Sequence, residues 1–456
     1  MRAGRNPLAH SVRVRAAGGF LPLLFALSGC ATYTDRVAQA NVAVSAGAYA
    51  DGLTAMNGLL GVSSADQLPD KWSGDRSLNV LERGVLQQSL GRYKGSARDF
   101  SAAEQELELL DLRADAIGAL GSYLYSDSVK TYRTPPTERL ALNAINLLNY
   151  LADGDLEGAA VEARRFQVMR EFLDTQGIDA SGPATLGTYL AGFVFERRGE
   201  GDRALRYYDE TLAGGALESL VAPVTRLAAV NPYRGEHVKE IVARAAPSPK
   251  KNAPPPTELL VVLSLGRVPH KVPERIPVGA AVGIAGTVLS GDTDFLKYGA
   301  TKVVVYPNLV STPSSLGPPL VRVDSQDVQL EQVTDLGAAV RREYDEAKPK
   351  ILAAALTRVA ARAAVSEGVR AGGSAESKLL GDVLSIAVES VMVALDKPDT
   401  RSWTTLPERV LVARVPVDPG SHTVDVSFEG TANAGRVQTV EVPSQGYAAV
   451  VVTEPR

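Results

Sequence analysis

A proline-rich segment divides this chain of 456 residues into two parts with different hydrophobic patterns. Residues 246–256 read Ala-Pro-Ser-Pro-Lys-Lys-Asn-Ala-Pro-Pro-Pro. Proline lacks a backbone N–H and fixes φ, so an extended spacer is favoured here over a helix or a central strand. Apolar residues recur every three or four positions before the segment, and in alternation or short runs after it. The sequence therefore predicts an α+β fold with a helical domain at 30–245, a linker at 246–256 and a β-rich domain at 257–456.

The helical part contains a pattern of small and aromatic residues that repeats. It resembles the tetratricopeptide repeat (TPR), a helix–turn–helix unit whose hairpins bury their apolar faces by stacking. The expected turn glycines are 44, 63 and 45 residues apart, so the array would be degenerate, with extra turns or helices between hairpins. The alternative is a generic helical bundle. The clearest copy consists of Gly84, Gly91, Tyr93, Ser96, Phe100 and Ala103, and the expected turn glycines are Gly47, Gly91, Gly154 and Gly199.

The part after the linker has the alternation of strands and a helical insertion at about 335–396. Within the insertion, Pro349 is expected to kink or restart the helix, because proline clashes with the preceding turn. The apolar segment 379–395 contains Asp382 and Glu389, which indicates a buried helix and not a membrane span. The hairpin around residues 418–421 resembles those of transthyretin-like and PEGA-type modules, so we expect a β-sandwich-like domain. The strand candidates are 258–265, 280–289, 301–306, 320–333, 409–417, 422–429, 437–442 and 447–453.

The first 29 residues are typical of a secretory signal peptide. Four arginines precede the apolar run Ala16–Leu27, which is too short to span a bilayer. The run ends in Leu27-Ser28-Gly29-Cys30, which resembles a bacterial lipobox, and Cys30 is the only cysteine. We expect cleavage before Cys30 and its acylation; the alternative is an ordinary signal peptide with a chance cysteine. In enterobacteria-like lipoproteins an aspartate after the cysteine favours the inner membrane, so Ala31 predicts lipid anchoring in the outer membrane, facing the periplasm.

The charge balance argues against a nucleic-acid partner. The chain has 48 Lys and Arg and 52 Asp and Glu, and loss of the four signal-peptide arginines leaves 44 against 52, a net charge of −8. Nucleic-acid binding needs a concentrated basic surface. The predicted membrane attachment must likewise come from acyl chains and not from attraction to anionic lipid.

The search for catalytic motifs is negative. The sequence contains no His-Glu-x-x-His, P-loop or Gly-x-Ser-x-Gly motif. Residues 248–251 match Ser-x-x-Lys but lie in the linker, where nothing would desolvate the lysine. His237, His270 and His422 are scattered, so we predict no metal site, no cofactor and no catalytic residue. The alternative is a periplasmic envelope enzyme, such as a glycan hydrolase, whose carboxylate pair has no local signature.

Two clusters are candidates for contact with a partner. Arg164, Arg165 and Arg170 lie on one predicted helix with Glu162 and Glu171. They form either a solvated face of ion pairs or an anion-binding contact.

The second cluster is Arg401-Ser402-Trp403, before a predicted strand. Trp403 would either fill the core or anchor a partner.

The segment 399–407, Asp-Thr-Arg-Ser-Trp-Thr-Thr-Leu-Pro, resembles one known group of proteins. These are uncharacterised bacterial lipoproteins with TPR-like repeats. The resemblance implies a role in the cell envelope and supplies no catalytic residue. Together with the lipobox, it predicts a protein-binding scaffold in envelope assembly or in the regulation of peptidoglycan synthesis. Its partner would be an envelope protein or a peptide bound in the groove of the helical repeats.

Overall fold

The computed structural model describes residues 31–109, 132–179, 181–245, 255–286, 303–371, 398–431 and 434–456. Within these residues the protein is a mixed α+β fold, as expected from the sequence. The predicted signal peptide with Cys30, residues 246–254 of the linker and the apolar segment 379–395 lie outside the described residues.

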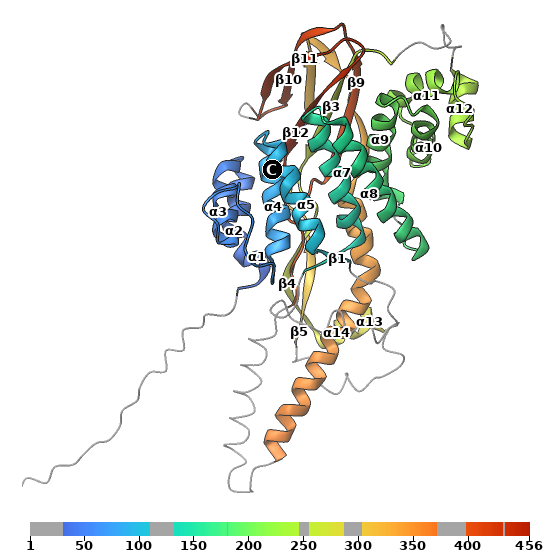
Figure 1. Cartoon of the computed structure of the whole chain (residues 1–456). Coiled ribbons are helices and arrows are strands. Elements are labelled where there is room, and N and C mark those ends of the chain that lie inside the picture. The colour runs from blue at the N-terminus through green and yellow to red at the C-terminus, as the bar shows by residue number, and fades with distance from the viewer. Residues whose placement is uncertain are drawn as a thin grey trace, which may run out of the picture.

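Paired helices form one side of the molecule (Figure 1). Consecutive helices pack as α4 with α5, α7 with α8, and α9 with α10. The bounds are α1 Tyr33–Arg36, α2 Ala38–Ser45, α3 Tyr49–Leu60, α4 Arg76–Ser89, α5 Tyr93–Glu106, α7 Pro136–Ala152, α8 Leu156–Thr175, α9 Ser181–Arg197, α10 Gly201–Leu212, the 3-10 turn η1 Glu218–Leu220, α11 Val221–Ala228 and α12 Glu236–Arg244.

The glycines predicted to end helices do so. Gly47, Gly91, Gly154 and Gly199 have φ values of 72°, 72°, 73° and 76°. This left-handed conformation strains other residues but not glycine, and it closes the last helical turn. The turns between paired helices were therefore predictable from sequence.

Small residues lie where paired helices touch. A Cβ atom on Gly84 would lie 2.5 Å from the Phe100 ring, and one on Gly192 would lie 2.4 Å from the Tyr208 ring. Both distances are too short for nonbonded carbon atoms, so the aromatic ring fills the space that a side chain would need.

We expect Gly192→Ala to lower the free energy of unfolding by about 1–3 kcal/mol, because overpacking forces the Tyr208 ring or the helix backbone to move. Urea unfolding followed by circular dichroism measures this. Gly58→Ala is the matched control, because no atom lies within 4 Å of its added Cβ. Alanine there should stabilise the helix by about 0.5–1 kcal/mol. Equal effects at both positions would contradict the close approach.

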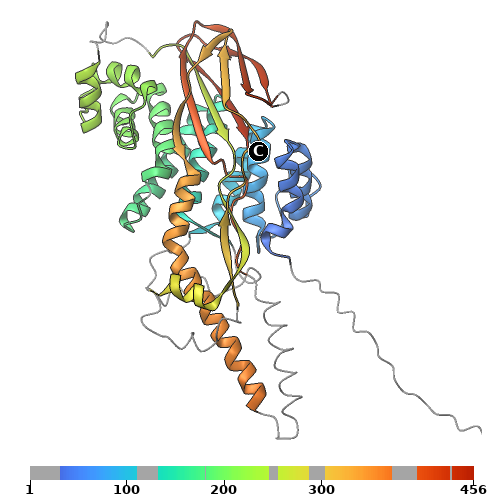
Figure 2. The same cartoon turned by 180° about the vertical axis from the view of Figure 1, so that it is seen from behind.

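Two four-stranded sheets form the other side (Figure 2). The first has the order β12-β3-β9-β8 and the second β11-β10-β6-β7; β12 runs parallel to β3 and the other pairs are antiparallel. A separate hairpin pairs β4 with β5. The bounds are β3 Glu258–Leu265, β4 His270–Pro277, β5 Val303–Val310, β6 Pro319–Val323, β7 Gln326–Val328, β8 Glu331–Asp335, β9 Arg409–Pro416, β10 Gly420–Phe428, β11 Arg436–Val442 and β12 Tyr447–Glu454; a short pair joins β1 Glu108–Leu109 to β2 Arg133–Thr134.

Strand β3 is buried on both faces, which explains its unbroken apolar sequence. Leu259, Val261 and Leu263 share a core with the second sheet, including Val424. Leu260 and Val262 share a core with the helices. Because side chains alternate along a strand, β3 belongs to both layers at once.

The helical and β-rich parts therefore share a core. Trp403 and Leu406, from the β-rich part, lie in one cluster with Phe100 of α5. The boundary at 246–256 stays a prediction. Because each part exposes apolar surface without the other, we do not expect the two to be independently stable after cleavage between them.

Two predictions in the β-rich part are corrected. Residues 280–285 are not a strand but belong to the helix α13, Val278–Ala285, whose buried residues Val278, Ala281 and Ala285 have helical spacing. The predicted strand 320–333 is three strands, because Asp324 and Ser325 have φ values of 48° and 70° and form a tight turn. Pro349 lies inside the described helix α14, Leu336–Ala371, so the helix does not restart there, and the alternative of a kink at Pro349 stays a prediction.

Candidate partner-binding site

The outer layer of the paired helices carries the predicted arginines. Helices α4 and α7 contact β12, and α9 contacts β8. The second helix of each pair, α5, α8 or α10, consequently lies on the outside (Figure 1). The inner side, where a repeat array would present a groove, is thus covered by the chain's own strands. This corrects the expectation of a ligand in the groove of the helical repeats, and the outer face is the accessible one.

An apolar stripe runs along the outer face of α8. Val161, Val168 and Phe172 are 43%, 67% and 45% exposed. Their spacing of seven and four residues places them on one side of the helix. Arg164 and Arg165 are exposed and flank these three side chains. We call Val161, Arg164, Arg165, Val168 and Phe172 the α8 stripe.

Arg164 and Arg165 of the α8 stripe differ in their ion pairing. Arg165 lies 3.5 Å from the carboxylates of Glu104 and Glu162, at the outer limit of an ion pair. For Arg164 the described residues provide no ion-pair partner. An exposed guanidinium beside apolar side chains suits a ligand that brings both a carboxylate and an apolar surface.

Arg170 does not belong to the α8 stripe. Its guanidinium lies 3.1 Å from Glu210 of α10 and 3.9 Å from Asp174, and its side chain is largely buried. Arg170 therefore joins two helices of the fold, which corrects its prediction as a partner contact.

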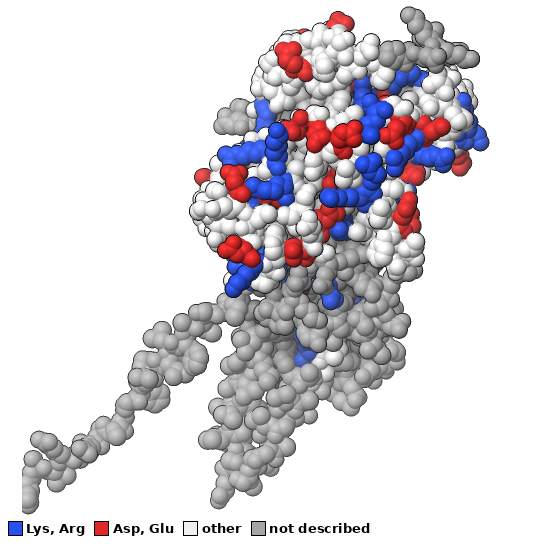
Figure 3. Space-filling view, in the orientation of Figure 1, with Lys and Arg blue, Asp and Glu red and all other residues white. Residues whose placement is uncertain are grey.

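Lys and Arg side chains alternate with Asp and Glu over the helical face in Figure 3. Several of these charges form ion pairs between helices, such as Arg139 with Glu104 at 3.2 Å. Many charges of this face therefore pair with neighbouring helices of the fold.

Trp403 and Arg401 are not available to a partner. Trp403 is 0% exposed and its ring centroid lies 5.7 Å from that of Phe100. Arg401 is 5% exposed, and its guanidinium contacts Asp399 at 2.6 Å. The partner-contact prediction is wrong for both, and the alternative of a core position describes Trp403.

Two buried carboxylates hold the segment around Trp403 in place. Glu82 accepts hydrogen bonds from the backbone N–H groups of Thr404 and Thr405, at 2.7 and 2.8 Å, and from both hydroxyls. Glu138 accepts one from the N–H of Trp403 at 3.1 Å and another from the Tyr132 hydroxyl. The segment that resembles the lipoprotein family is therefore a connector between the two parts of the fold.

Glu82 was overlooked in the sequence, although a signal existed. It lies among Leu78, Leu81 and Val85 at helical spacing, so an acidic residue occupies the apolar face of α4. A buried acid requires donors. The sequence cannot say which donors, because Thr404 and Thr405 are more than 300 residues away and no local pattern links them to Glu82.

Burial raises the pKa of Glu138 to about 7, because water can no longer solvate its charge; the Tyr132 hydrogen bond and the positive charge of Lys271 oppose this shift. Burial likewise raises the pKa of Glu82, against the hydrogen bonds from Thr405 and Thr404. Both carboxyls accept hydrogen bonds from backbone N–H groups of the segment around Trp403. Their raised pKa values therefore have a structural cause.

Glu138 predicts a pH dependence of stability. The pKa of Glu138 is about 7 in the folded protein and near 4.5 in the unfolded chain. The stability that its protonated carboxyl contributes is therefore fully present below pH 4.5 and is lost as the pH rises through 7. Glu138→Gln cannot titrate and still offers an acceptor. We expect the free energy of unfolding of the wild type, relative to this variant, to fall by on the order of 3 kcal/mol between pH 4.5 and 8. Urea unfolding at several pH values measures the difference; parallel curves would contradict it.

A small cavity between two carboxyls bears on the alternative of an enzyme. Glu138, Glu343, Lys271 and Ser402 line a volume of about 50 Å³. Glu343 accepts the N–H of Thr137 at 3.0 Å, and the Lys271 ammonium donates to the carbonyl of Arg401 at 3.2 Å. Such a space holds one or two water molecules and not a sugar ring. This carboxyl pair therefore gives no support to glycan hydrolysis.

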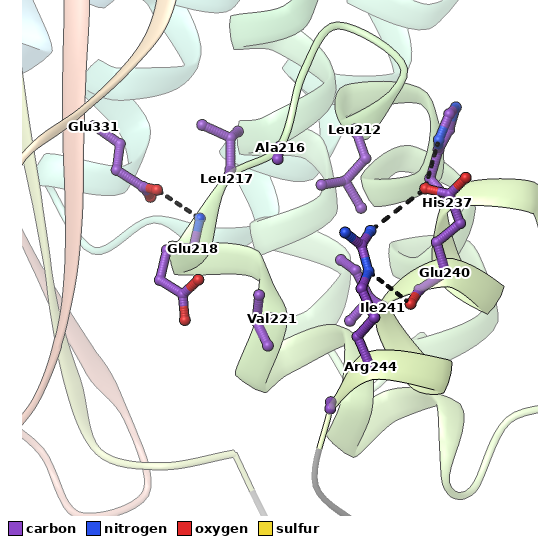
Figure 4. A pocket seen from close by; sticks show the side chains of 11 residues that line it. Leu212, Ala216, Leu217, Glu218, Val221, His237, Glu240, Ile241, Arg244 and Glu331 are labelled. Carbon is purple, nitrogen blue, oxygen red and sulfur yellow. Dashed lines mark hydrogen bonds and ion pairs between the residues drawn. The ribbon is translucent and has the colours of Figure 1, made fainter.

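A larger cavity lies at the end of the helical part (Figure 4). Its volume is about 540 Å³, and residues from the α10–α11 connection, α11, α12 and β8 line it. Leu217 and Ile241 form part of the apolar floor, and carboxylates lie at the rim. His237, which the sequence left without a role, lies 3.8 Å from Glu240.

No group of three or more His, Cys, Asp or Glu side chains within the described residues could hold a metal ion. No described helix is long and apolar enough to cross a membrane.

None of the family models, curated proteins or solved structures with which the chain was compared matches it.

Proposed function

We propose that this protein is an outer-membrane lipoprotein that serves as a protein-binding scaffold in the cell envelope, and that the α8 stripe is its partner contact. The observation that carries the proposal is an apolar face without a partner, flanked by Arg164. Of the ten large apolar residues exposed in the described chain, three lie in this stripe. Exposed apolar groups that cluster in this way are typical of interaction sites.

The partner that fits is an amphipathic helix with acidic residues beside its apolar face. Val161, Val168 and Phe172 span three helical turns, which matches the spacing of anchors in helix recognition. A carboxylate on the partner would pair with Arg164, which has no such partner within the described chain. Removal of the Arg164 charge would then weaken binding, and so would removal of the apolar anchors.

The proposed lipid anchor would hold the body close to the membrane. Tyr33 is buried and follows the proposed acylated Cys30 by three residues. Thr34 donates to the carbonyl of Lys271 at 2.7 Å, so this end of the chain is packed on the fold. Three residues span about 10 Å at most. The end of the molecule with α1 would therefore face the bilayer, and β5 and α14 extend from that end (Figure 1).

The assignment of the helix pairs to TPR-like repeats and of the two sheets to a β-sandwich-like domain is part of this proposal. Its support is the left-handed turn glycines and the apolar core shared by the two sheets. An envelope role in assembly or in the regulation of peptidoglycan synthesis rests on the resemblance of residues 399–407 to the lipoprotein family.

The anchor is tested with Cys30→Ala. We expect the variant to leave the outer-membrane fraction, either as a soluble species or as an uncleaved precursor. Density-gradient separation of the two membranes, with mass spectrometry of the N-terminus, measures this. A processed variant that stays in the outer-membrane fraction would refute lipid anchoring.

The partner contact is tested by photo-crosslinking in intact envelopes, with the photoreactive residue at position 168. The matched control is position 42, where Val42 is 71% exposed on α2. We expect one protein to crosslink from position 168 and not from position 42. The crosslinked segment of that partner should have acidic and apolar residues at helical spacing. A synthetic copy of that peptide should bind the mature chain, at least tenfold more weakly after Arg164→Glu. The same crosslinks from both positions, or binding unaffected by Arg164→Glu, would overturn the proposal.

A further inference from the structure

We propose a second binding site, the 540 Å³ cavity between η1, α12 and β8, which takes a peptide segment that carries a lysine or arginine next to a leucine-sized side chain. This site is separate from the α8 stripe, and the inference does not depend on the identity of the partner bound there. A cavity of this size lies within the usual range for ligand pockets and accommodates a few side chains.

The apolar part of the cavity is built from the ends of helices. Leu212 ends α10, Leu217 precedes η1, and Ile241 lies on α12. These side chains also pack into the helical core, so the floor is held rigidly. A preformed floor favours binding because less order must be imposed on association.

The charges around the cavity do not balance. Three carboxylates, from Glu218, Glu240 and Glu331, face one guanidinium, from Arg244. Glu240 is the acid engaged by that guanidinium, at 3.5 Å, and by His237, at 3.8 Å (Figure 4). With His237 neutral, the lining carries a net charge of −2.

The two remaining carboxylates act differently. Glu331 accepts the backbone N–H groups of Glu218 and Ser219, at 2.5 and 2.9 Å, and so caps η1 without an opposing charge. The side chain of Glu218 is exposed and has no ion-pair partner within the described residues. A cation at the mouth would approach both acids, which selects a basic side chain over an acidic one.

The test uses the mature full-length chain with labelled isoleucine methyl groups and two probes, acetyl-Leu-Lys-Leu-amide and acetyl-Leu-Glu-Leu-amide. The Ile241 methyl signal, assigned through Ile241→Val, reports occupancy. We expect the lysine probe to shift this signal with a Kd near or below about 1 mM, at least tenfold tighter than the glutamate probe. Added salt should weaken the lysine probe, because the site is open to solvent.

Two variants distinguish the site from nonspecific contact. Ala216→Trp fills the cavity from an exposed position and should abolish the shift, while Val42→Trp on α2 should not. Glu218→Gln should weaken the lysine probe severalfold and leave the glutamate probe no weaker. No shift at Ile241 up to several millimolar probe, equal affinity for both probes, or binding that survives Ala216→Trp would each overturn the proposal.

Discussion

Replacing Glu82 with alanine should lower the free energy of unfolding by about 3–5 kcal/mol. The carboxylate accepts both backbone N–H groups and both hydroxyls of Thr404 and Thr405, and the Tyr33 hydroxyl at 3.2 Å. Without it, two buried N–H groups have no acceptor, and each unsatisfied group costs about 1–3 kcal/mol. Hydroxyls can rotate toward other acceptors, so they add less.

Urea unfolding measures this effect, followed by circular dichroism and, in a Trp72→Phe background that leaves Trp403 as the only tryptophan, by emission. Because Trp403 precedes the two threonines, its emission should shift to longer wavelength before global unfolding in Glu82→Ala. Glu106→Ala is the control, because Glu106 is an exposed acid near the end of α5. A loss below about 1 kcal/mol for Glu82→Ala would show that the segment 399–407 does not depend on this carboxylate.

Replacing Arg414 with methionine should cost about 3–5 kcal/mol, because it leaves buried acids without a counter-charge. The guanidinium joins Glu196 of α9, at 2.9 and 3.0 Å, to Glu258 of β3, and it also donates a hydrogen bond to the Tyr208 hydroxyl oxygen at 3.1 Å. Arg226 also contacts Glu196, and Arg197 contacts Glu258, so part of the charge is still balanced in the variant.

The same variant should change the acid limb of the stability profile. Burial alone would raise the pKa of Glu196, but Arg414 and Arg226 outweigh it and lower the pKa to about 2. A depressed folded pKa contributes stability above the unfolded value near 4.5, and this stability is lost as the pH falls toward 2. Arg414→Met should reduce this acid-dependent loss.

The control for Arg414→Met is Arg322→Met, which removes an exposed ion pair with Asp327 on a strand. Exposed pairs contribute little, so its urea midpoint should change little at any pH. Similar destabilisation in the two variants would contradict a special role for the buried network.

Local features of this chain could be predicted from the sequence. Gly91 and Gly199 are single residues that must adopt positive φ, and β3 is an apolar run bounded by turn residues. Residues 280–285 were mispredicted as part of a strand because their small apolar side chains suit a strand and a helix equally. In the helix α13, Ala281 and Ala285 lie on one face and pack in one core with residues of α14.

Long-range pairings could not be predicted. The choice of which helical face meets the sheet depends on β12, which lies at the far end of the chain from α4. The role of Trp403 likewise depends on Glu82 and Glu138, and no local pattern links them. Only Arg164 and Arg165 of the predicted contacts lie on an accessible face, because exposure is decided by this packing.

The central claim is that a partner covers the α8 stripe in the native envelope. Since Cys30 is the only cysteine and its thiol would carry the acyl chain, a cysteine introduced at position 168 would be the only free thiol. The decisive measurement is the rate of maleimide labelling of Val168→Cys in opened native outer membranes and in purified protein, with Val42→Cys as the control. We predict at least tenfold slower labelling of Val168→Cys in the membranes and unchanged labelling of Val42→Cys. Equal rates for Val168→Cys in both preparations would contradict the account.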